Sequence, residues 1–436
     1  MADLPGLLAD RLQSLSSVRR WVIAFSGGLD SRVLLELCVR TQAKDRLLAL
    51  HVNHALQADA DLWARQCEAV CQTLGVPFRE LKVDPGSGSE ADLRQARYGA
   101  FQRLLEAGDC LLLGHHADDQ AETLLLRLLR GAGPRGLAGM PWGRPLGRAQ
   151  LYRPLLDRSR AELERWARAQ GLEWIEDPSN ASDAYERNWL RQRIVAPLRQ
   201  RWPQLARRVT ATTAQLSETA TLLDEIAQAD LAALQRWPER LPLAPLRALS
   251  RPRQHNLLRH WVQRHTQHWL EADELCQLEQ SVIGARDDGT PALKLGSLWL
   301  RRYRDELYLL PEVAAPGLAQ MLCVAPGEQR LAQGRLTLQA QAGPGLRPGQ
   351  RLRLDYRRGG ERLRPQGRGG SVTLKQLLQE AGIPPWWRSG WPLLFDGDEL
   401  VAVPGVCLCE GAATANGIRP LWQPFGLSEP WGFGRL

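Results

Sequence analysis

The chain has 436 residues, 44% of them hydrophobic, which predicts two or three domains rather than one. Its net charge of +8 and 16 tryptophans favour a polyanionic partner such as nucleic acid, although a generally basic soluble protein is the alternative. The eight cysteines show no Cys-x-x-Cys pair and no zinc spacing, and buried thiols in a reducing compartment fit them best. Because no signal peptide and no apolar run of bilayer length is seen, we expect a cytoplasmic protein without a membrane partner.

After a short helix within residues 1–20, the first informative stretch reads as strand, tight turn and helix. An apolar run at 21–25 leads into Ser26, Gly27 and Gly28, and an amphipathic run follows at helical spacing. The glycines let the backbone turn sharply and approach a ligand. The free N–H groups of the first helical turn favour an anion, and Ser31 adds a hydroxyl. The stretch predicts a phosphate-binding loop, with a side-chain-capped glycine turn as the alternative.

The type of loop follows from what it contains and lacks. A Walker A loop needs Gly-x-x-x-x-Gly-Lys followed by Ser or Thr, and the chain has no such stretch. Asp30 is an unusual neighbour for a polyphosphate unless a cation lies between them. The pattern Ser-Gly-Gly-x-Asp-Ser resembles the signature of the PP-loop ATP pyrophosphatases. That resemblance implies ATP binding and cleavage between the α- and β-phosphates.

Strands and helices then alternate. Strands are expected at 47–53, 77–83 and 109–114, and helices at 57–74 and 89–107. This period predicts an α/β fold with a doubly wound parallel sheet, covered on both faces. Ligands of such sheets bind at the carboxyl ends of the strands. The polar stretches 26–31, 53–54 and 115–119 all fall there, so we expect them to converge on one site.

The stretch 115–123 passes from a strand into a helix and carries the second chemical cluster. Asp119 and Glu122 are three residues apart, so both carboxylates share one helical face. Together with Asp30 they would form a hard oxygen site for Mg²⁺. Acidic residues in a first helical turn also compensate the helix dipole, which is the alternative.

Residues 131–136 fit Gly-x-Gly-x-x-Gly but follow a helix instead of a strand, so we reject a dinucleotide site. We expect a mobile loop that approaches a nucleic-acid backbone between Arg130 and Arg135. A turn at 177–180 precedes a helix that bears Arg187 and Arg191, for which a solvated basic face is the alternative.

The second half reads as helices at 204–234 and 251–283, a hairpin at 292–310, a linker at 311–317 and a last domain with short strands. Arg358, Arg362 and Trp387 lie in arginine-rich stretches interleaved with Gly and Trp, which suits phosphate contact and base stacking. The alternative is a small β-rich domain with an arginine-decorated surface.

Six stretches in order resemble the tRNA(Ile)-lysidine synthetase family, over roughly the first half of the chain. They are Ser-Gly-Gly-Leu-Asp-Ser, His-Val-Asn-His-Ala-Leu, Arg-Tyr, His-His-Ala-Asp-Asp-Gln-Ala-Glu-Thr, Arg-Gly-Ala-Gly-Pro-Arg-Gly-Leu and Glu-Asp-Pro-Ser-Asn followed by Arg-Asn-x-x-Arg. The tail is similar to the C-terminal domain of the longer members. The resemblance implies a PP-loop catalytic domain at 1–208, a mostly helical tRNA-binding domain at 209–312 and a small α+β tRNA-binding domain at 318–436.

The family reaction that the resemblance implies ligates free L-lysine to carbon 2 of the wobble cytidine of tRNA(Ile) with a CAU anticodon. The base oxygen attacks the α-phosphorus of ATP and releases pyrophosphate, and the lysine side-chain amine then displaces AMP. Codon specificity changes from AUG to AUA. A homodimer is one expected assembly. The runner-up is a PP-loop tRNA base thiolase, which would need suitable cysteines near the site, and none is expected there. A tRNA-binding module with a degenerate ATP site would be expected to have lost Asp30, Asp119 or Glu122, and all three are present.

The resemblance also implies roles for individual residues. Those expected to bind ATP are Ser26, Gly27, Gly28, Leu29, Asp30, Ser31, His51, Asn53, Gly114 and His115. Those expected to serve Mg²⁺ and catalysis are Asp30, Asp119 and Glu122, with Arg97 and Arg187 as further catalytic groups. Those expected to contact nucleic acid are Arg94, Arg130, Arg135, Arg191, Arg358, Arg362 and Trp387.

Overall fold

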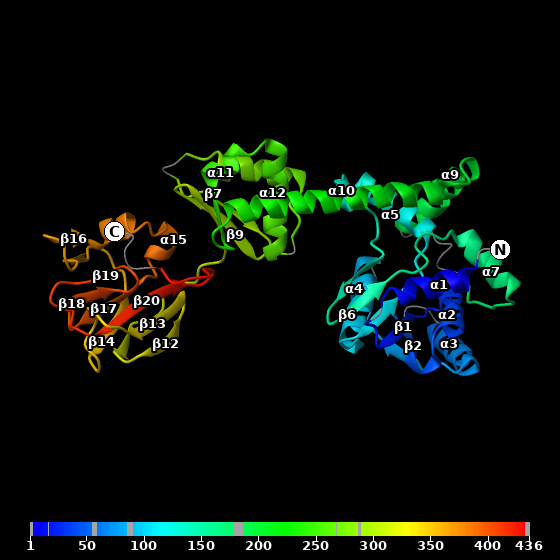
Figure 1. The fold of residues 1–436 in the computed structure, drawn as a ribbon, viewed down its shortest axis with the longest axis horizontal. Coiled ribbons are helices and arrows are strands. Elements are labelled where there is room, and N and C mark those ends of the chain that lie inside the picture. The colour runs from blue at the N-terminus through cyan, green and yellow to red at the C-terminus, as the bar shows by residue number, and fades with distance from the viewer. Residues whose placement is uncertain are drawn as a thin grey trace. The chain divides into compact units, whose positions relative to one another are not determined.

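The computed structural model describes residues 3–15, 17–54, 59–84, 90–177, 186–266, 268–286 and 289–431 (Figure 1). The chain divides into two compact units, Met1–Leu222 and Leu223–Leu436, with the boundary inside the long helix α10 (Leu205–Leu234). Within the described ranges, no helix combines the length and the apolar character needed to span a membrane. Residues 178–180 of the turn expected at 177–180 lie outside these ranges.

The first unit is built on one six-stranded sheet with the order β3-β2-β1-β4-β6-β5. Strands β3, β2, β1, β4 and β6 are parallel neighbours, and β5 pairs with β6 in the antiparallel sense. The strands are β1 (Arg20–Ala24), β2 (Leu47–Asn53), β3 (Phe78–Lys82), β4 (Asp109–Leu112), β5 (Gly143–Leu146) and β6 (Ala149–Tyr152). The predicted parallel sheet is confirmed, and the β5–β6 hairpin at its edge is an addition that the sequence did not suggest.

Helices cover both faces of this sheet. Neighbouring residues of β1 point to opposite faces, so Trp21 and Ile23 enter one apolar core and Val22 enters the other. The helices are α1 (Leu4–Gln13), α2 (Leu29–Thr41), η1 (Lys44–Arg46), α3 (Ala60–Leu74), α4 (Glu90–Leu104), α5 (Ala117–Leu129), α6 (Pro134–Leu137), α7 (Arg160–Ala169), α8 (Glu186–Leu190), the π-helical turn η3 (Arg191–Val195) and α9 (Ala196–Arg201).

The first part of the second unit packs helices against a small antiparallel sheet, β7-β10-β9-β8. Its elements are β7 (Arg240–Pro242), α11 (Leu243–Ala248), α12 (Arg251–Thr266), α13 (Ala272–Leu278), η4 (Glu279–Ile283), β8 (Ala292–Leu295), β9 (Leu298–Tyr303) and β10 (Glu306–Pro311). The predicted hairpin at 292–310 is therefore a three-stranded meander. Its third strand was merged with the second because Arg304, in the turn between them, looked like another alternating strand residue.

The rest of the second unit is β-rich, with sheets β11-β14-β17-β18-β19, β12-β13-β20 and β15-β16. The elements are β11 (Gln320–Cys323), β12 (Gly327–Leu331), β13 (Gly334–Ala340), β14 (Arg351–Tyr356), β15 (Arg362–Leu363), β16 (Val372–Thr373), α14 (Leu374–Glu380), α15 (Pro385–Arg388), β17 (Pro392–Asp396), β18 (Glu399–Val403), β19 (Cys407–Leu408) and β20 (Ile418–Pro424). Tyr308 and Leu310 of β10 belong to the same apolar core as this region, so the two parts of the unit share a core.

Candidate active site

The predicted phosphate-binding loop lies between β1 and α2. Gly27 has φ +84°, and its carbonyl oxygen accepts a hydrogen bond from Ile175 N at 3.0 Å. A Cβ at this position would lie 2.5 Å from Ile175 Cδ1, so only glycine fits. Ser31 Oγ accepts from Ser26 N (3.2 Å) and donates to Gly28 O (3.0 Å), which closes the loop on itself. The chain thus fixes the loop conformation with its own contacts.

Residues on the neighbouring strands support this loop. His51 Nδ1 donates to Phe25 O at 2.9 Å, and burial lowers the pKa of His51, which keeps the ring neutral. A Cβ on Gly114 would lie 2.9 Å from Asp30 O, so glycine is needed where the end of β4 meets the start of α2. Asn53 is 2% exposed and donates to Asp61 Oδ1 (2.9 Å) and Glu80 Oε1 (2.8 Å). In the described contacts His51 and Gly114 support the loop, and Asn53 links α3 to β3. The role of all three residues in ATP binding stays a prediction.

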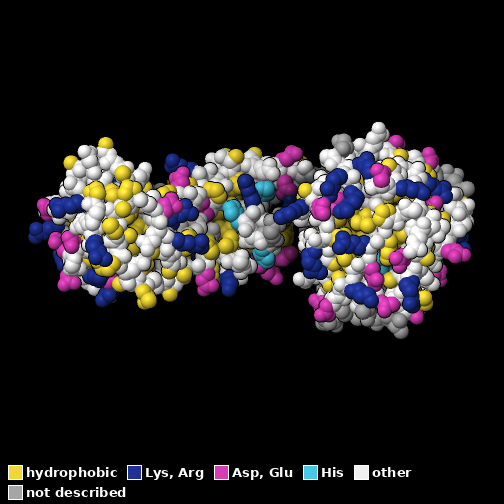
Figure 2. Space-filling view, turned by 90° about the horizontal axis from the view of Figure 1, so that it is seen from below, with side chains coloured by type: hydrophobic (Ala, Val, Ile, Leu, Met, Phe, Trp, Pro, Cys, Tyr) yellow, Lys and Arg dark blue, Asp and Glu magenta, His cyan; other side chains and the backbone are white. Residues whose placement is uncertain are grey.

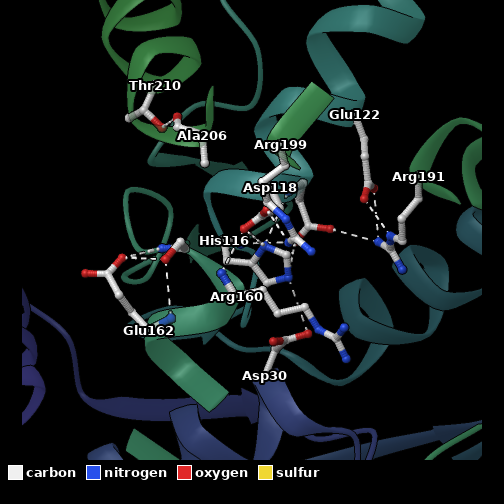
Figure 3. Close-up of polar contacts among 12 residues, drawn as sticks. Asp30, His116, Asp118, Glu122, Arg160, Glu162, Arg191, Arg199, Ala206 and Thr210 are labelled. Atoms are coloured by element: carbon white, nitrogen blue, oxygen red, sulfur yellow. Dashed lines mark hydrogen bonds and ion pairs between the residues drawn. The ribbon is translucent and has the colours of Figure 1, made fainter. Parts of the chain in front are cut away.

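His116 lies between carboxylates of two helices (Figure 3). Its Nε2 is 3.5 Å from Asp30 Oδ2 of α2 and 3.5 Å from Asp119 Oδ2 of α5. Burial alone would lower the pKa of His116, but Asp119 and Asp30 outweigh this and raise the pKa to about 9. The Asp119 carboxylate also accepts from His116 N at 3.0 Å, so it does act as the helix cap that was the alternative to metal binding. The protonated His116 ring thus connects two of the predicted polar stretches, residues 26–31 and 115–119. The helix cap fixes the Asp119 side of this connection.

The Glu122 side chain is 1% exposed and is bonded to two arginines, one in α8 and one in η3. Arg187 Nε donates to Glu122 Oε2 at 2.7 Å, and Arg191 Nε donates to Oε1 at 2.5 Å. Arg187 Nη2 also reaches Asp119 Oδ1 at 3.0 Å. Burial lowers the pKa of Arg187, but Asp119 and Glu122 outweigh it and the net pKa is raised. Both arginines therefore carry full charge and neutralise the α5 carboxylates.

His115 is a neutral ring with a defined tautomer. Arg153 Nε donates to His115 Nδ1 at 3.1 Å, so the ring proton sits on Nε2. Burial lowers the pKa of His115 to about 3. Arg153 is itself 2% exposed and also donates to Pro141 O at 2.7 Å. Arg153 was not predicted as a site residue, because a single arginine after a short strand carries no recognisable pattern.

One oxygen of the cluster suits a hard cation. Asp30 Oδ1 is buried without a hydrogen-bond partner in the described part of the chain, while Oδ2 faces His116. A buried carboxylate oxygen without a partner is costly, and a cation such as Mg²⁺ would relieve this cost. Within the described ranges no group of three or more His, Cys, Asp or Glu is arranged as a metal site. Asp119 and Glu122 both accept hydrogen bonds from Arg187 and Arg191. Asp119 also shares the His116 ring with Asp30, so Asp30 and Asp119 fit the predicted Mg²⁺ better than Glu122.

Asp118 is a second residue that the sequence pattern did not single out. It is 6% exposed, accepts from Arg160 N at 2.8 Å and accepts from Arg199 Nη1 at 3.2 Å (Figure 3). It thus ties the start of α5 to α7 and α9. Its sequence neighbour Asp119 looked chemically equivalent, and only the fold separates the two. Asp118 bonds to α7 and α9 and lies 3.8 Å from His116 Nδ1, whereas Asp119 lies 3.5 Å from His116 Nε2, the nitrogen that also faces Asp30.

The predicted nucleic-acid contacts of the first unit lie on its surface or close to it. Arg94 is exposed and lies over the Tyr98 ring at 5.2 Å. Arg97, which was predicted as a catalytic group, is also exposed, and its charge adds to burial in lowering the pKa of His54. Arg130 pairs with Glu186, and Arg135 is half-buried. On the face drawn in Figure 2, Lys and Arg side chains border an apolar area of the first unit. These positions are compatible with RNA contact, which stays a prediction.

The three residues of the second unit that were predicted to contact nucleic acid differ in their exposure. Arg358 and Arg362 are exposed, although Arg358 Nη2 pairs with Asp355 Oδ2 at 2.8 Å. Trp387 is 2% exposed and packs edge-on against Tyr308 and Trp431, with centroids 6.1 and 6.2 Å apart. Its ring has no free face for a base, so the stacking role expected for Trp387 is wrong. Sequence spacing cannot separate a buried indole from an exposed one.

One cysteine lies near the candidate site, although the sequence predicted none there. A Cβ on Gly27 would lie 2.8 Å from Cys67 Sγ, so a thiol does lie against the phosphate loop. Burial raises the pKa of Cys67 and of Cys71 to about 12, which keeps both thiols protonated. All eight cysteines are free, six of them buried as expected and Cys276 and Cys323 exposed. Cys67 thus packs beneath the loop instead of presenting a thiolate to it.

Comparisons with known proteins cover nearly the whole chain. A family described as PP-loop domain matches residues 7–198, a TilS substrate binding domain matches 241–308, and a TilS substrate C-terminal domain matches 352–422. The chain is 44% identical to a tRNA(Ile)-lysidine synthase of Pseudomonas aeruginosa, over 95% of this chain and 96% of that protein. It is 40% identical to one of Shigella flexneri, over 94% and 98%. A U34-tRNA thiolase structure from Methanococcus maripaludis is 17% identical, with a TM-score of 0.40 over 49% of this chain and 78% of that one.

Proposed function

The chain belongs to the tRNA(Ile)-lysidine synthase family, and we propose that the Gly27 loop and the start of α5 form its ATP site. It is an ATP-dependent ligase that forms lysidine on tRNA(Ile). The observation that carries the site assignment is the position of Asp30. One of its oxygens is buried without a partner in the described chain, and the other faces the His116 ring, which Asp119 shares.

The loop would bind the phosphates of ATP. The backbone N–H groups at the start of α2 are free for an anion, and the helix dipole favours negative charge there. Ser26 and Ser31 place hydroxyls on the same loop, 3.1 Å apart. His115 adds a neutral Nε2–H donor at the start of α5, since Arg153 occupies Nδ1. These donors would orient the α-phosphorus toward the base oxygen, which attacks it as pyrophosphate leaves.

Mg²⁺ would be held by Asp30 and Asp119. When bound, it would stabilise the negative charge that develops on the departing pyrophosphate. His116 keeps the two carboxylates in place from the protein side, at 3.5 Å from each. Arg187 lies next to this pair and would lend positive charge to the same phosphates, as its proposed catalytic role requires.

Adenylation explains why ATP is split before lysine is added. The base oxygen is a poor leaving group, and its adenylate is a good one, so the lysine amine can displace AMP from carbon 2. Free L-lysine as co-substrate, the CAU anticodon, a homodimer and a cytoplasmic location follow from the family resemblance and are proposals for this chain. The thiolase alternative is less supported, because Cys67 beside the loop is a buried, protonated thiol.

Product analysis tests the proposed site. Labelled ATP incubated with the protein, Mg²⁺ and tRNA(Ile) should give AMP and pyrophosphate, and only when tRNA is present. The control omits tRNA. Formation of ADP and orthophosphate instead would contradict cleavage between the α- and β-phosphates.

A further inference from the structure

An exposed tryptophan lies on the surface where α9 meets α10. Trp202 is 46% exposed, yet its backbone is fixed: its N donates to Leu198 O at 2.8 Å and its O accepts from Leu205 N at 2.9 Å. Its indole makes no ring, cation–π or hydrogen-bond contact with any residue that the structure describes. Tryptophan is well buried on average, so core packing does not explain why a tryptophan stands at this exposed position.

Three arginines surround it in the sequence. Arg201, Arg207 and Arg208 are all exposed, and none of them forms an ion pair within the described ranges. Arg207 and Arg208 lie in the first turn of α10, where the helix dipole disfavours cations and no acidic residue compensates them. Neither ion pairing nor helix stability therefore accounts for these arginines. We call Arg201, Trp202, Arg207 and Arg208 the α9–α10 corner.

The corner is tied to the candidate active site within the first unit. Arg199 donates to Asp118 Oδ1 at 3.2 Å, at the start of α5. Trp202 follows Arg199 by three residues, about 5 Å along a helix axis at 1.5 Å per residue. α10 also packs beside the segment that follows α6, because a Cβ on Gly139 would lie 3.1 Å from Thr213 Cγ2. An RNA whose target base enters the site would pass close to this corner.

We propose that the α9–α10 corner binds unpaired nucleotides that flank the target base of the RNA substrate. Trp202 stacks on one base, and Arg201, Arg207 and Arg208 contact the adjoining phosphates. An exposed ring with exposed, unpaired arginines close to it in the sequence matches single-stranded RNA, which combines flat bases with a charged backbone. An acidic protein would satisfy the arginines but would leave the flat face of the indole without a matching group. The inference rests on the proposed function, since it takes the substrate to be tRNA.

The test measures tRNA binding to full-length variants. Trp202→Ala should raise the Kd for tRNA about tenfold, the lower range of losing one stacked base, whereas Trp202→Phe should keep most of the affinity. Arg207→Gln/Arg208→Gln should lower the slope of log affinity against log salt by about 0.7 for each phosphate that the variant no longer neutralises. Leu62→Ala removes an exposed apolar side chain elsewhere in the unit, and Arg79→Gln/Arg103→Gln removes two other exposed arginines. Both controls should bind tRNA like the wild type.

Two further readouts separate this inference from its alternatives. The Kd for ATP and the melting temperature should not change in Trp202→Ala, which excludes unfolding as the cause. Wild-type tRNA affinity in Trp202→Ala overturns the inference, and so does a change in oligomeric state without a change in tRNA affinity. Failure of the wild type to form lysidine would overturn the proposed function, and the binding comparison would still decide the role of the corner.

Discussion

Ile175 donates a backbone hydrogen bond to Gly27 O at 3.0 Å, and its side chain fills the space where a Cβ on Gly27 would lie. A segment about 150 positions later in the sequence thus closes over the phosphate loop. Cys67 packs against the same glycine from α3. The loop conformation therefore depends on three separate parts of the first unit. Even a small substitution at Gly27 should alter the proposed ATP site.

Gly27→Ala should abolish measurable ATP binding. The added methyl would meet Ile175 Cδ1 at 2.5 Å, at a φ of +84° that side-chain-bearing residues rarely adopt. Isothermal titration calorimetry with ATP and Mg²⁺ measures the effect. Gly133→Ala is the matched control, because nothing lies within 4 Å of its Cβ and its φ of −76° suits alanine. An unchanged Kd for ATP in Gly27→Ala would contradict the described loop.

Asp119→Asn should lower turnover by ~10²–10³, the effect of losing one preorganised electrostatic group. The amide oxygen can still accept the His116 N hydrogen bond, so the helix cap and the melting temperature should be largely kept. Steady-state lysidine formation at saturating Mg²⁺ measures turnover. Near-normal activity would reduce Asp119 to a helix cap.

Trp387→Ala should destabilise the second unit by about 3–5 kcal/mol, because it leaves a cavity in the aromatic core around Tyr308 and Trp431. Arg358→Gln/Arg362→Gln should instead leave stability nearly unchanged and reduce the salt dependence of tRNA binding. Urea unfolding and filter binding are measured on both variants. Equal stability of Trp387→Ala and the wild type would show that the ring is not a core residue.

Asp157 makes a pH-dependent contribution to the stability of the first unit. Burial raises its pKa, but hydrogen bonds from Arg11 (2.7 Å) and Arg158 (2.8 Å) outweigh this and lower the pKa from 3.8 to about 2. Since the folded pKa lies below the unfolded one, the stabilisation is complete above about pH 4 and disappears as the pH falls toward 2. Asp157→Asn should therefore cost about 2 kcal/mol at pH 7. Unfolding free energies should converge below pH 4, and a difference independent of pH would contradict the ion pair.

Local patterns predicted the elements that place the site. The apolar run before Gly27, the alternation of strands and helices, and the polar residues at three strand ends are all short-range signals, and the sheet order confirms their convergence. The edge hairpin was missed because β5 is short, mostly exposed and contains Gly143 and Pro145, which read as a loop.

The remaining errors concern contacts between distant segments. Arg153 reaches His115 across 38 positions, and Arg187 reaches Glu122 across 65, so neither partner can be read from spacing. Trp387 was taken for a surface residue because its arginine neighbours are polar, whereas the core that buries it comes from other strands. The position of Cys67 under the phosphate loop was missed because α3 and the loop are distant in the sequence. Burial of a single side chain depends on tertiary packing, which periodicity in one segment does not encode.

Mass analysis of tRNA tests the central claim most directly. tRNA(Ile) with a CAU anticodon is incubated with the protein, ATP, Mg²⁺ and L-lysine, and its nucleosides are then separated and weighed. We expect one cytidine to gain the mass of lysine less one water, only when ATP and lysine are both present. An unmodified cytidine, or a nucleoside that has exchanged oxygen for sulfur, would contradict the assignment.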